Sequence, residues 1–259
     1  MIRSQVARLV AVAVLAAVAF RAEAVTLSFD SNAAGAQDAT IADGSLQNNV
    51  FLTYTALEVS GNSGGGGMNS RSVLQFDVNA LAGQYSSIDA ITLRLTTSYN
   101  QAGAADTNIH QALASWVESQ VSWNNRQTAT PWASAGGEFS PSVLGSIDVS
   151  TLANSGAFDG VQEQVTVSLL PGASNAAARK ALIDSWTSGG NFGLLLKSAT
   201  DTTAFVGYRD RSRGFEADRP LLTIEFSEIA LVPEPSSILL MTAGTCLLVC
   251  RRRKHRQTL

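Results

Sequence analysis

The stretch Ile91-Thr92-Leu93-Arg94-Leu95-Thr96 decides the fold class of this chain, because apolar and polar residues alternate along it without interruption. Successive side chains of a β-strand point to opposite faces, so Ile91, Leu93 and Leu95 lie on one face and the polar residues on the other. This alternation predicts a strand with one buried face.

The same pattern recurs along the chain, with clusters of Gly, Asn, Asp and Ser between the strands. Many short strands without alternating long helices indicate an all-β, antiparallel, jelly-roll-like β-sandwich. Helix-forming residues with Ala178, Leu182 and Trp186 on one face predict one short helix over residues 176–186, packed on an edge or end of the sheet. The further predicted strands are Val25–Phe29, Val50–Tyr54, Ala56–Val59, Ser72–Val78, Val143–Val149, Val165–Leu169, Phe192–Leu196 and Leu221–Phe226.

The first 24 residues are typical of a secretory signal peptide. Arg3 and Arg8 precede an apolar run from Leu9 to Phe20, and Ala22-Glu23-Ala24 offers small residues for cleavage before Val25. The sequence therefore predicts an exported protein that is processed by signal peptidase, with a single folded body over residues 25–228.

The end of the chain carries three features in order. A linker over residues 229–235 contains Val232-Pro233-Glu234-Pro235, an apolar segment covers residues 236–250, and Arg251, Arg252 and Arg253 begin a basic tail over residues 251–259. Prolines end regular structure, and a basic cluster stays on the cytoplasmic side of a membrane. As a helix, the apolar segment would rise about 22 Å, against a hydrocarbon core of about 30 Å. The segment is therefore a permanent anchor or a transient stop, and its short length favours the second.

This arrangement resembles the PEP-CTERM sorting signal of exported proteins in Gram-negative bacteria that make exopolysaccharide. The resemblance covers Val232 to about Arg256. It implies that an exosortase removes the tail near the Pro-Glu-Pro motif after transient insertion into the inner membrane. The body would then reach the cell surface or the extracellular matrix.

The charge of the body excludes one class of partner. The whole chain has a formal net charge of -3, but residues 25–232 hold 10 Lys and Arg against 19 Asp and Glu, a net charge of -9. An acidic body has no electrostatic attraction for nucleic acid or anionic membranes.

Cysteine and histidine exclude several kinds of site. Both cysteines, Cys246 and Cys250, lie in the apolar tail, and His110 is the one histidine of the body. The body therefore has no disulfide, no thiolate nucleophile and no multi-histidine zinc site. His110 lies in an alternating segment without a nucleophile motif nearby, so a place on a strand surface is favoured over catalysis.

No catalytic residue, metal site or cofactor is predicted. Calcium is left open, because carboxylates from several loops can bind it. Asp38, Asp43 and Asp77 are candidates by availability alone.

A segment that we call the tryptophan segment, residues 116–126, reads Trp-Val-Glu-Ser-Gln-Val-Ser-Trp-Asn-Asn-Arg. It resembles the W-x-E-x-x-V-T-W-N-N-R-P motif of the DNRLRE domain, also classed as carbohydrate-binding module family 96. Arg71–Val78, Ser87–Leu95 and Arg219–Ile224 resemble other strands of that family, in the same order. Gln127 stands where the family has proline. The resemblance implies a jelly-roll sandwich that binds carbohydrate.

Two roles are open for the tryptophan segment and the residues after it. Aromatic rings stack on the apolar faces of sugars, and polar side chains bind sugar hydroxyls. Trp116 and Trp123 would fill the core or contact ligand, and the core is favoured. Trp132 is expected to be more exposed and is the better stacking candidate. The polar residues that follow could bind a sugar; these are Asn124, Asn125 and Arg126. Alternatively they could hold the loop in place. In that case the two asparagines would form an Asx turn, and Arg126 would form an ion pair with Glu118.

The arginine segment, residues 208–219, is the second candidate. Tyr208, Arg209 and Arg211 would contact an acidic sugar, because the guanidinium fork binds carboxylates with two hydrogen bonds. The other interpretation, a solvated loop whose charges pair with one another, is favoured.

The sequence therefore predicts an exported surface or matrix protein that binds exopolysaccharide. One alternative is a structural matrix protein without ligand. A less favoured one is a glycan-cleaving enzyme, which would need a pair of carboxylates that nothing in the sequence singles out.

Overall fold

The computed structural model describes residues 24–51, 56–61, 68–153, 162–212 and 215–229. Those from Ala24 to Glu228 form one compact unit built from antiparallel strands. The strands are β1 (Ala24–Asp30), β2 (Gln37–Ala42), β3 (Ala56–Ser60), β4 (Ser70–Gln75), β5 (Tyr85–Asn100), β6 (Thr107–Ala112), β7 (Asn125–Gln127), β8 (Thr130–Pro131), β9 (Phe139–Ile147), β10 (Gln164–Ser168), β11 (Leu194–Ser198), β12 (Phe205–Arg209) and β13 (Leu221–Glu228). The helix is α2 (Ala176–Ser185), and single helical turns lie at Gly44–Leu46, Asn79–Leu81, Val149–Thr151, Ala173–Asn175, Trp186–Gly190 and Glu216–Asp218.

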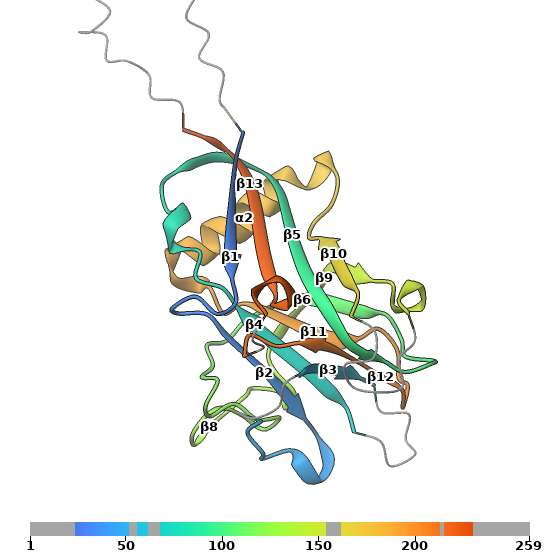
Figure 1. Ribbon diagram of the computed structural model, residues 1–259. Coiled ribbons are helices and arrows are strands. Elements are labelled where there is room, and N and C mark those ends of the chain that lie inside the picture. Colours follow the sequence, from blue (N-terminus) through green and yellow to red (C-terminus); the bar gives the residue numbers. More distant parts are fainter. Residues whose placement is uncertain (1–23, 52–55, 62–67, 154–161, 213–214, 230–259) are drawn as a thin grey trace, which may run out of the picture. The chain divides into compact units, whose positions relative to one another are not determined.

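The sheet is continuous and curls over itself (Figure 1). Its order is β1-β13-β5-β12-β3-β4-β11-β6-β9, with β10 paired to β5 and β2 paired to β4. Strand β5, 16 residues long, connects the two layers. Its first part pairs with β13 as far as Arg94, and its last part pairs with β12 from Thr97 onward. The predicted all-β antiparallel sandwich with one short helix is confirmed.

The main core lies between the two layers. Ile91, Leu93 and Leu95 of β5 are buried there, as their alternation predicted. The opposite layer contributes Leu74 of β4 and Leu196 of β11. Burial of such side chains is the dominant favourable term in folding, at roughly 1.5–3 kcal/mol for each.

The helix is confirmed at Ala176–Ser185, and it packs against β5. The buried face differs from the predicted one, because Ala178 is exposed and Arg179 is buried. The Arg179 guanidinium donates hydrogen bonds to the carbonyl oxygens of Ile88, Leu170 and Gly172 at 3.1, 2.7 and 2.8 Å. A buried cation is tolerated here because backbone oxygens accept its hydrogen bonds.

Some predicted strand bounds are wrong. The strand predicted at Val50–Tyr54 is not seen at Val50 and Phe51, and residues 52–55 lie outside the described part of the chain. The strands β2 and β12, which carry much of the candidate site, were not predicted. In β2, apolar and polar residues do not alternate regularly, because the strand is buried along most of its length.

A second core lies on the other face of the β2–β4–β11 layer. It is covered by residues 113–138, which we call the covering segment, between β6 and β9. Ala39, Ile41, Val73 and Leu195 of the sheet pack there against Trp116, Val121, Trp123 and Trp132. The sheet layer is therefore buried on both faces, which explains why its strands are apolar without strict alternation.

Within the described residues, no helix has the length and apolar character needed to cross a membrane. The signal peptide, the Pro-Glu-Pro linker, the apolar tail and the basic cluster lie outside the described residues. Their predictions are untested by the structure.

Candidate functional site

All three tryptophans of the covering segment are buried. Trp116, Trp123 and Trp132 are 3%, 8% and 5% exposed. The indole nitrogen of Trp116 donates to the carbonyl oxygen of Phe192 at 3.0 Å, and that of Trp132 donates to Ser122 at 2.9 Å. The core interpretation of Trp116 and Trp123 is confirmed. The expected exposure of Trp132 is wrong, because its ring closes the second core.

The polar residues after Trp123 hold the covering segment together. Asn124 Nδ2 donates to Asn48 Oδ1 at 2.9 Å, and the backbone N–H of Asn125 donates to the Ser122 hydroxyl at 3.1 Å. Arg126 Nη1 donates to the carbonyl and hydroxyl oxygens of Ser115. The predicted ion pair between Arg126 and Glu118 is therefore wrong, and Ser122 rather than an asparagine side chain caps the turn.

The first residues of the arginine segment, Tyr208, Arg209 and Asp210, are buried rather than solvated. Tyr208 is fully buried in the main core, where its hydroxyl donates to Thr107 Oγ1 at 2.8 Å. Arg209 is 3% exposed and lies 3.6 Å from Asp218, an ion pair within the segment. The interpretation as a loop that pairs its own charges holds for Arg209 but fails for Arg211.

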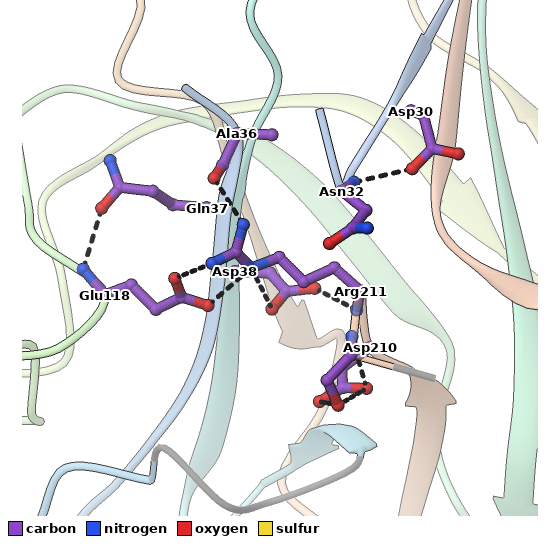
Figure 2. A network of polar contacts seen from close by, with 9 residues as sticks. Asp30, Asn32, Ala36, Gln37, Asp38, Glu118, Asp210 and Arg211 are labelled. Atoms are coloured by element: carbon purple, nitrogen blue, oxygen red, sulfur yellow. Dashed lines mark hydrogen bonds and ion pairs between the residues drawn. The ribbon is translucent and has the colours of Figure 1, made fainter. Parts of the chain in front are cut away.

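Arg211 joins the two segments that stand out in the sequence. Its Nε and Nη2 atoms donate to the two carboxylate oxygens of Glu118 at 2.9 and 2.5 Å, and its Nη1 donates to the carbonyl of Ala36 at 2.9 Å. Its backbone N–H donates to Asp38 Oδ2 at 2.8 Å. Figure 2 shows Arg211 between Glu118 and Asp38. Both sides of the guanidinium fork are thus occupied within the protein.

A polar cleft of about 270 Å³ adjoins this pair, where β12 ends and β2 and β3 lie close together. Its polar part comes from the turn after β1, from β2, from Glu118 and from the residues after β12. Phe51, Ala56 and Leu57 add an apolar part. The full lining is Asn32, Asp38, Ala39, Thr40, Phe51, Ala56, Leu57, Glu118, Asp210, Arg211 and Ser212.

Local structure positions the cleft residues. The alternation of β2 buries Ala39 and Ile41 in the second core and turns Asp38 and Thr40 to the opposite side. Thr40 Oγ1 donates to the Ala56 carbonyl at 3.1 Å and accepts from the Glu58 N–H at 3.0 Å, which holds β2 beside β3.

The remaining polar residues stand in short turns. Asp210 accepts hydrogen bonds from the backbone and hydroxyl of Ser212, so the chain turns sharply after β12. The backbone N–H of Asn32 donates a hydrogen bond to Asp30 Oδ1 at 2.6 Å, and this bond holds Asn32 in the turn after β1 (Figure 2). The exposed Asn32 side chain is thereby left at the cleft.

Asp38 has an unusual protonation equilibrium. The pKa of the Asp38 carboxyl is raised from 3.8 to about 7. Burial is the main cause and the charges of Asp210 and Glu118 act in the same direction, whereas the Arg211 N–H and guanidinium oppose the rise. Desolvation disfavours the charged form of a carboxyl. Near neutral pH the cleft therefore contains one titrating carboxyl beside a charged Glu118–Arg211 pair.

The calcium candidates do not gather at one place. Asp38 accepts from Arg211, Asp43 accepts from Asn69, and Asp77 accepts from the N–H of Asn79. In the part of the chain that the structure describes, no group of three or more His, Asp or Glu side chains is arranged to hold a metal ion.

His110 lies in β6 as predicted, but not on its surface. Its side chain is 4% exposed, and Nδ1 lies 2.9 Å from the carbonyl oxygen of Ser140. Burial lowers the pKa of the imidazole.

Carbohydrate-binding module family 96 matches residues 30–197, well over half of the chain. The chain belongs to carbohydrate-binding module family 96. The matched range contains Asn32, Asp38 and Glu118 of the cleft, as well as the whole covering segment. None of the curated proteins compared with the chain matches it.

Family membership identifies the described body as a carbohydrate-binding module. The sequence motif of the resemblance consists largely of residues that build the covering segment, and Glu118 alone among its polar residues lines the cleft. Sequence reasoning missed Asn32, Thr40 and Ser212, whose contribution depends on chain segments far apart in sequence. It found Asp38 only as a loose calcium candidate and paired Glu118 with the wrong arginine.

Proposed function

We propose that this protein is an exported surface or matrix protein whose module binds exopolysaccharide in the cleft beside Glu118 and Arg211. The observation that carries the proposal is the cleft itself, which lies within a carbohydrate-binding module and combines polar groups with an apolar wall. Binding sites for small ligands are typically concave, with a few placed polar groups.

The chemistry of the cleft suits sugar hydroxyls better than sugar carboxylates. Asp38, Glu118 and Asp210 supply acceptor oxygens, and Asn32 and Ser212 supply groups that both donate and accept. Glu118 takes the Nε and Nη2 edge of the Arg211 guanidinium, and Nη1 donates to the Ala36 carbonyl. A uronic acid would therefore meet three carboxyl groups without a free guanidinium edge.

The same contacts favour holding a glycan over cleaving it. Hydrolysis uses two carboxyl groups on either side of the glycosidic bond. Here both Glu118 oxygens accept from Arg211, and Asp38 is 5% exposed, with one oxygen bound to a backbone N–H. A reducing-end assay with the polysaccharides that the protein retains tests this point, and release of new ends would contradict it.

Asn32→Ala tests the cleft directly. The exposed Asn32 side chain can give a donor and an acceptor to a sugar, and the backbone bond to Asp30 does not depend on it. We expect the variant to weaken binding about fivefold, since one hydrogen bond contributes roughly 1 kcal/mol, with unchanged unfolding. Affinity gel electrophoresis of the body with a panel of neutral polysaccharides measures the change.

A matched control is Asn79→Ala. Asn79 is also exposed, and its N–H donates to the carboxylate two residues earlier, Asp77, at 3.0 Å. Asn79 does not line the cleft. Equal loss of binding in both variants would rule out the cleft as the binding site. Retention on no polysaccharide would favour the alternative of a matrix protein without ligand.

The sorting route is part of the same proposal. Support comes from the signal-peptide pattern of the first 24 residues and from the Pro-Glu-Pro, apolar and basic elements at residues 232–259. In this route signal peptidase and an exosortase process the chain, and the tail enters the inner membrane only transiently. The body then remains at the cell surface or in the matrix of a Gram-negative bacterium.

Mass spectrometry of the mature protein tests the sorting route. In a strain with an exosortase we expect a chain that begins at Val25 and ends near Val232–Pro235. In a strain without the exosortase we expect the tail to be kept. Recovery of a C-terminus at Leu259 in both strains would contradict the proposal.

A further inference from the structure

Strand β1 ends the sheet with one open edge. Within the described residues it pairs only with β13, and it lies at the margin of the sheet (Figure 1). Ser31, the residue after β1, donates its N–H to the carbonyl of Pro220 at 3.2 Å. Bonded and non-bonded residue pairs alternate along an antiparallel ladder, so the odd-numbered residues of β1 form the hydrogen bonds to β13. The backbone groups of Thr26 and Ser28 therefore point to the open side.

These outward backbone groups are available to another strand. In the part of the chain that the structure describes, no hydrogen bond reaches the N–H or the carbonyl of Thr26 or Ser28 on the open side. The side chains of both residues are exposed. A row of unpaired N–H and carbonyl groups at a strand edge is a template for pairing with a further strand.

The strand at the other end of the sheet order is protected against such pairing. Strand β9 contains Pro141, which has no N–H to donate, and its ladder with β6 is irregular at two places. The Leu144 carbonyl accepts the N–H of Leu170 at 2.7 Å. A Cβ on Gly145 would lie 2.9 Å from the carbonyl oxygen of Ser168, so β10 comes close to β9 there. Proline, bulges and cover are the usual means of blunting a strand edge.

Strand β1 carries none of these protective features. Its residues 24–29 read Ala-Val-Thr-Leu-Ser-Phe, without proline or charge, and its register with β13 is unbroken. Its inner face is also incompletely covered. Val25 and Leu27 pack on the main core but are only partly buried, whereas Phe226 and Ile224, opposite them on β13, are 0% exposed. A strand added beside β1 would cover this apolar side.

We propose that β1 pairs antiparallel with β1 of a second copy of this chain, about a twofold axis at Leu27. Such an interface uses the same surface on both copies. Thr26 and Ser28 lie at equal distances on either side of Leu27, so Thr26 stands opposite Ser28 of the partner subunit. The two residues exchange N–H···O bonds through the groups that point to the open side. The sheet then continues from one copy into the other.

The sequence of β1 is self-complementary in this register. On the inner face Val25 meets Phe29 of the partner subunit, and Leu27 meets the partner's Leu27. Asp30, the one charged residue of β1, stands away from the partner's Asp30, at the start of the partner strand. Cleavage of the signal peptide before Val25 would place an α-ammonium group there, a charge opposite to that of Asp30. This last point rests on the proposed export route.

Pairing has a consequence for the proposed function. Two clefts held in one dimer let a single polysaccharide bind both, which raises its apparent affinity without any new contact. The pairing itself is measured without glycan. Failure of glycan binding in the cleft and failure of pairing are therefore distinguishable.

The test is sedimentation velocity of the mature protein over a wide range of concentration. We expect a reversible equilibrium between monomer and dimer, because one strand pair buries less than the roughly 1,600 Å² of a standard stable interface. Thr26→Pro should raise the dissociation constant of the dimer at least about tenfold. Proline removes the outward N–H from each copy and leaves the bonds to β13 in place, as edge strands tolerate. A monomer at every concentration would overturn the proposal.

The matched control is Thr26→Val, which keeps the N–H and a β-branched side chain of the same shape. We expect it to dimerise to within about twofold of the wild type. Urea unfolding of Thr26→Pro checks that this variant is folded. Equal weakening by both substitutions, or a dimer that Thr26→Pro leaves unchanged, would place the contact elsewhere and rule out pairing through β1.

A charge exchange tests the register and does not depend on the proline variant. Thr26→Lys combined with Ser28→Lys places like charges opposite one another across the proposed pair, and Thr26→Glu combined with Ser28→Glu does the same. We expect each double variant alone to be a monomer, and an equimolar mixture to form a heterodimer, because opposite charges then face one another. A mixture that stays monomeric, or double variants that dimerise alone, would overturn the proposed pairing.

Discussion

Trp132→Ala should lower the free energy of unfolding by about 3–5 kcal/mol, the range for removal of a large buried aromatic side chain. Trp132 is 5% exposed and packs in the second core with Trp116 and Trp123. The substitution removes the contacts of its ring and leaves the Ser122 carbonyl without the indole donor at 2.9 Å. Urea unfolding followed by far-UV circular dichroism measures the change.

Two further variants make this prediction specific. Phe215→Ala removes a side chain that is 74% exposed, and we expect a change below about 0.5 kcal/mol. Trp132→Phe keeps most of the apolar volume, so we expect a folded protein that binds glycan as the wild type does. A Trp132→Phe variant of wild-type stability that no longer binds glycan would show that Trp132 contacts the ligand.

Asp38→Asn should make the protein more stable at pH 8 but not at pH 4. In the folded state the pKa of Asp38 is about 7, against 3.8 as the ordinary value. Between these two values the folded state keeps a proton that the unfolded state has lost, so stability falls as pH rises through this window. The full loss is about 4 kcal/mol at most, from 1.36 kcal/mol for each pKa unit. Asparagine has the same shape, can accept the Arg211 N–H through its side-chain oxygen, and carries no charge at any pH.

The measurement is the difference in unfolding free energy between Asp38→Asn and the wild type, from urea titrations at pH 4, 6 and 8. Using the difference removes the contribution of other groups such as His110. Asp89→Asn is the control, because it removes a carboxylate of the same kind from an exposed position. A gap between Asp38→Asn and the wild type that stays constant from pH 4 to pH 8 would contradict the prediction.

The strands of the main core were predictable because their signal is local. Alternation in Ile91–Thr96 is a property of neighbouring residues, and any strand with one buried face must show it. Strand β2 escaped prediction because both of its faces are covered, one by the second core and the other by contacts with β3. Burial on both faces removes the alternation from which a strand is recognised.

The candidate site was predictable in part. Glu118 and Arg211 were both singled out as residue types that bind sugars or pair with charges. The sequence did not show that these two residues pair with each other. The two residues are 93 positions apart, and Arg126, only eight residues from Glu118, was the nearer candidate in sequence. Chain folding places Ser115 rather than Glu118 at the Arg126 guanidinium. The prediction that Trp132 is exposed was wrong for the same reason, because the strands that cover its ring come from other parts of the chain.

The sequence by itself determined the fold class, the single helix, the absence of cysteine chemistry in the body and the family resemblance, since each depends on composition or on short-range pattern. The tertiary structure alone decided which charges meet. It brought Arg211 to Glu118 and Asp38, and Arg209 to Asp218. Pairing of charges depends on distance in space, and in an antiparallel sandwich residues that are distant along the chain become neighbours through strand register.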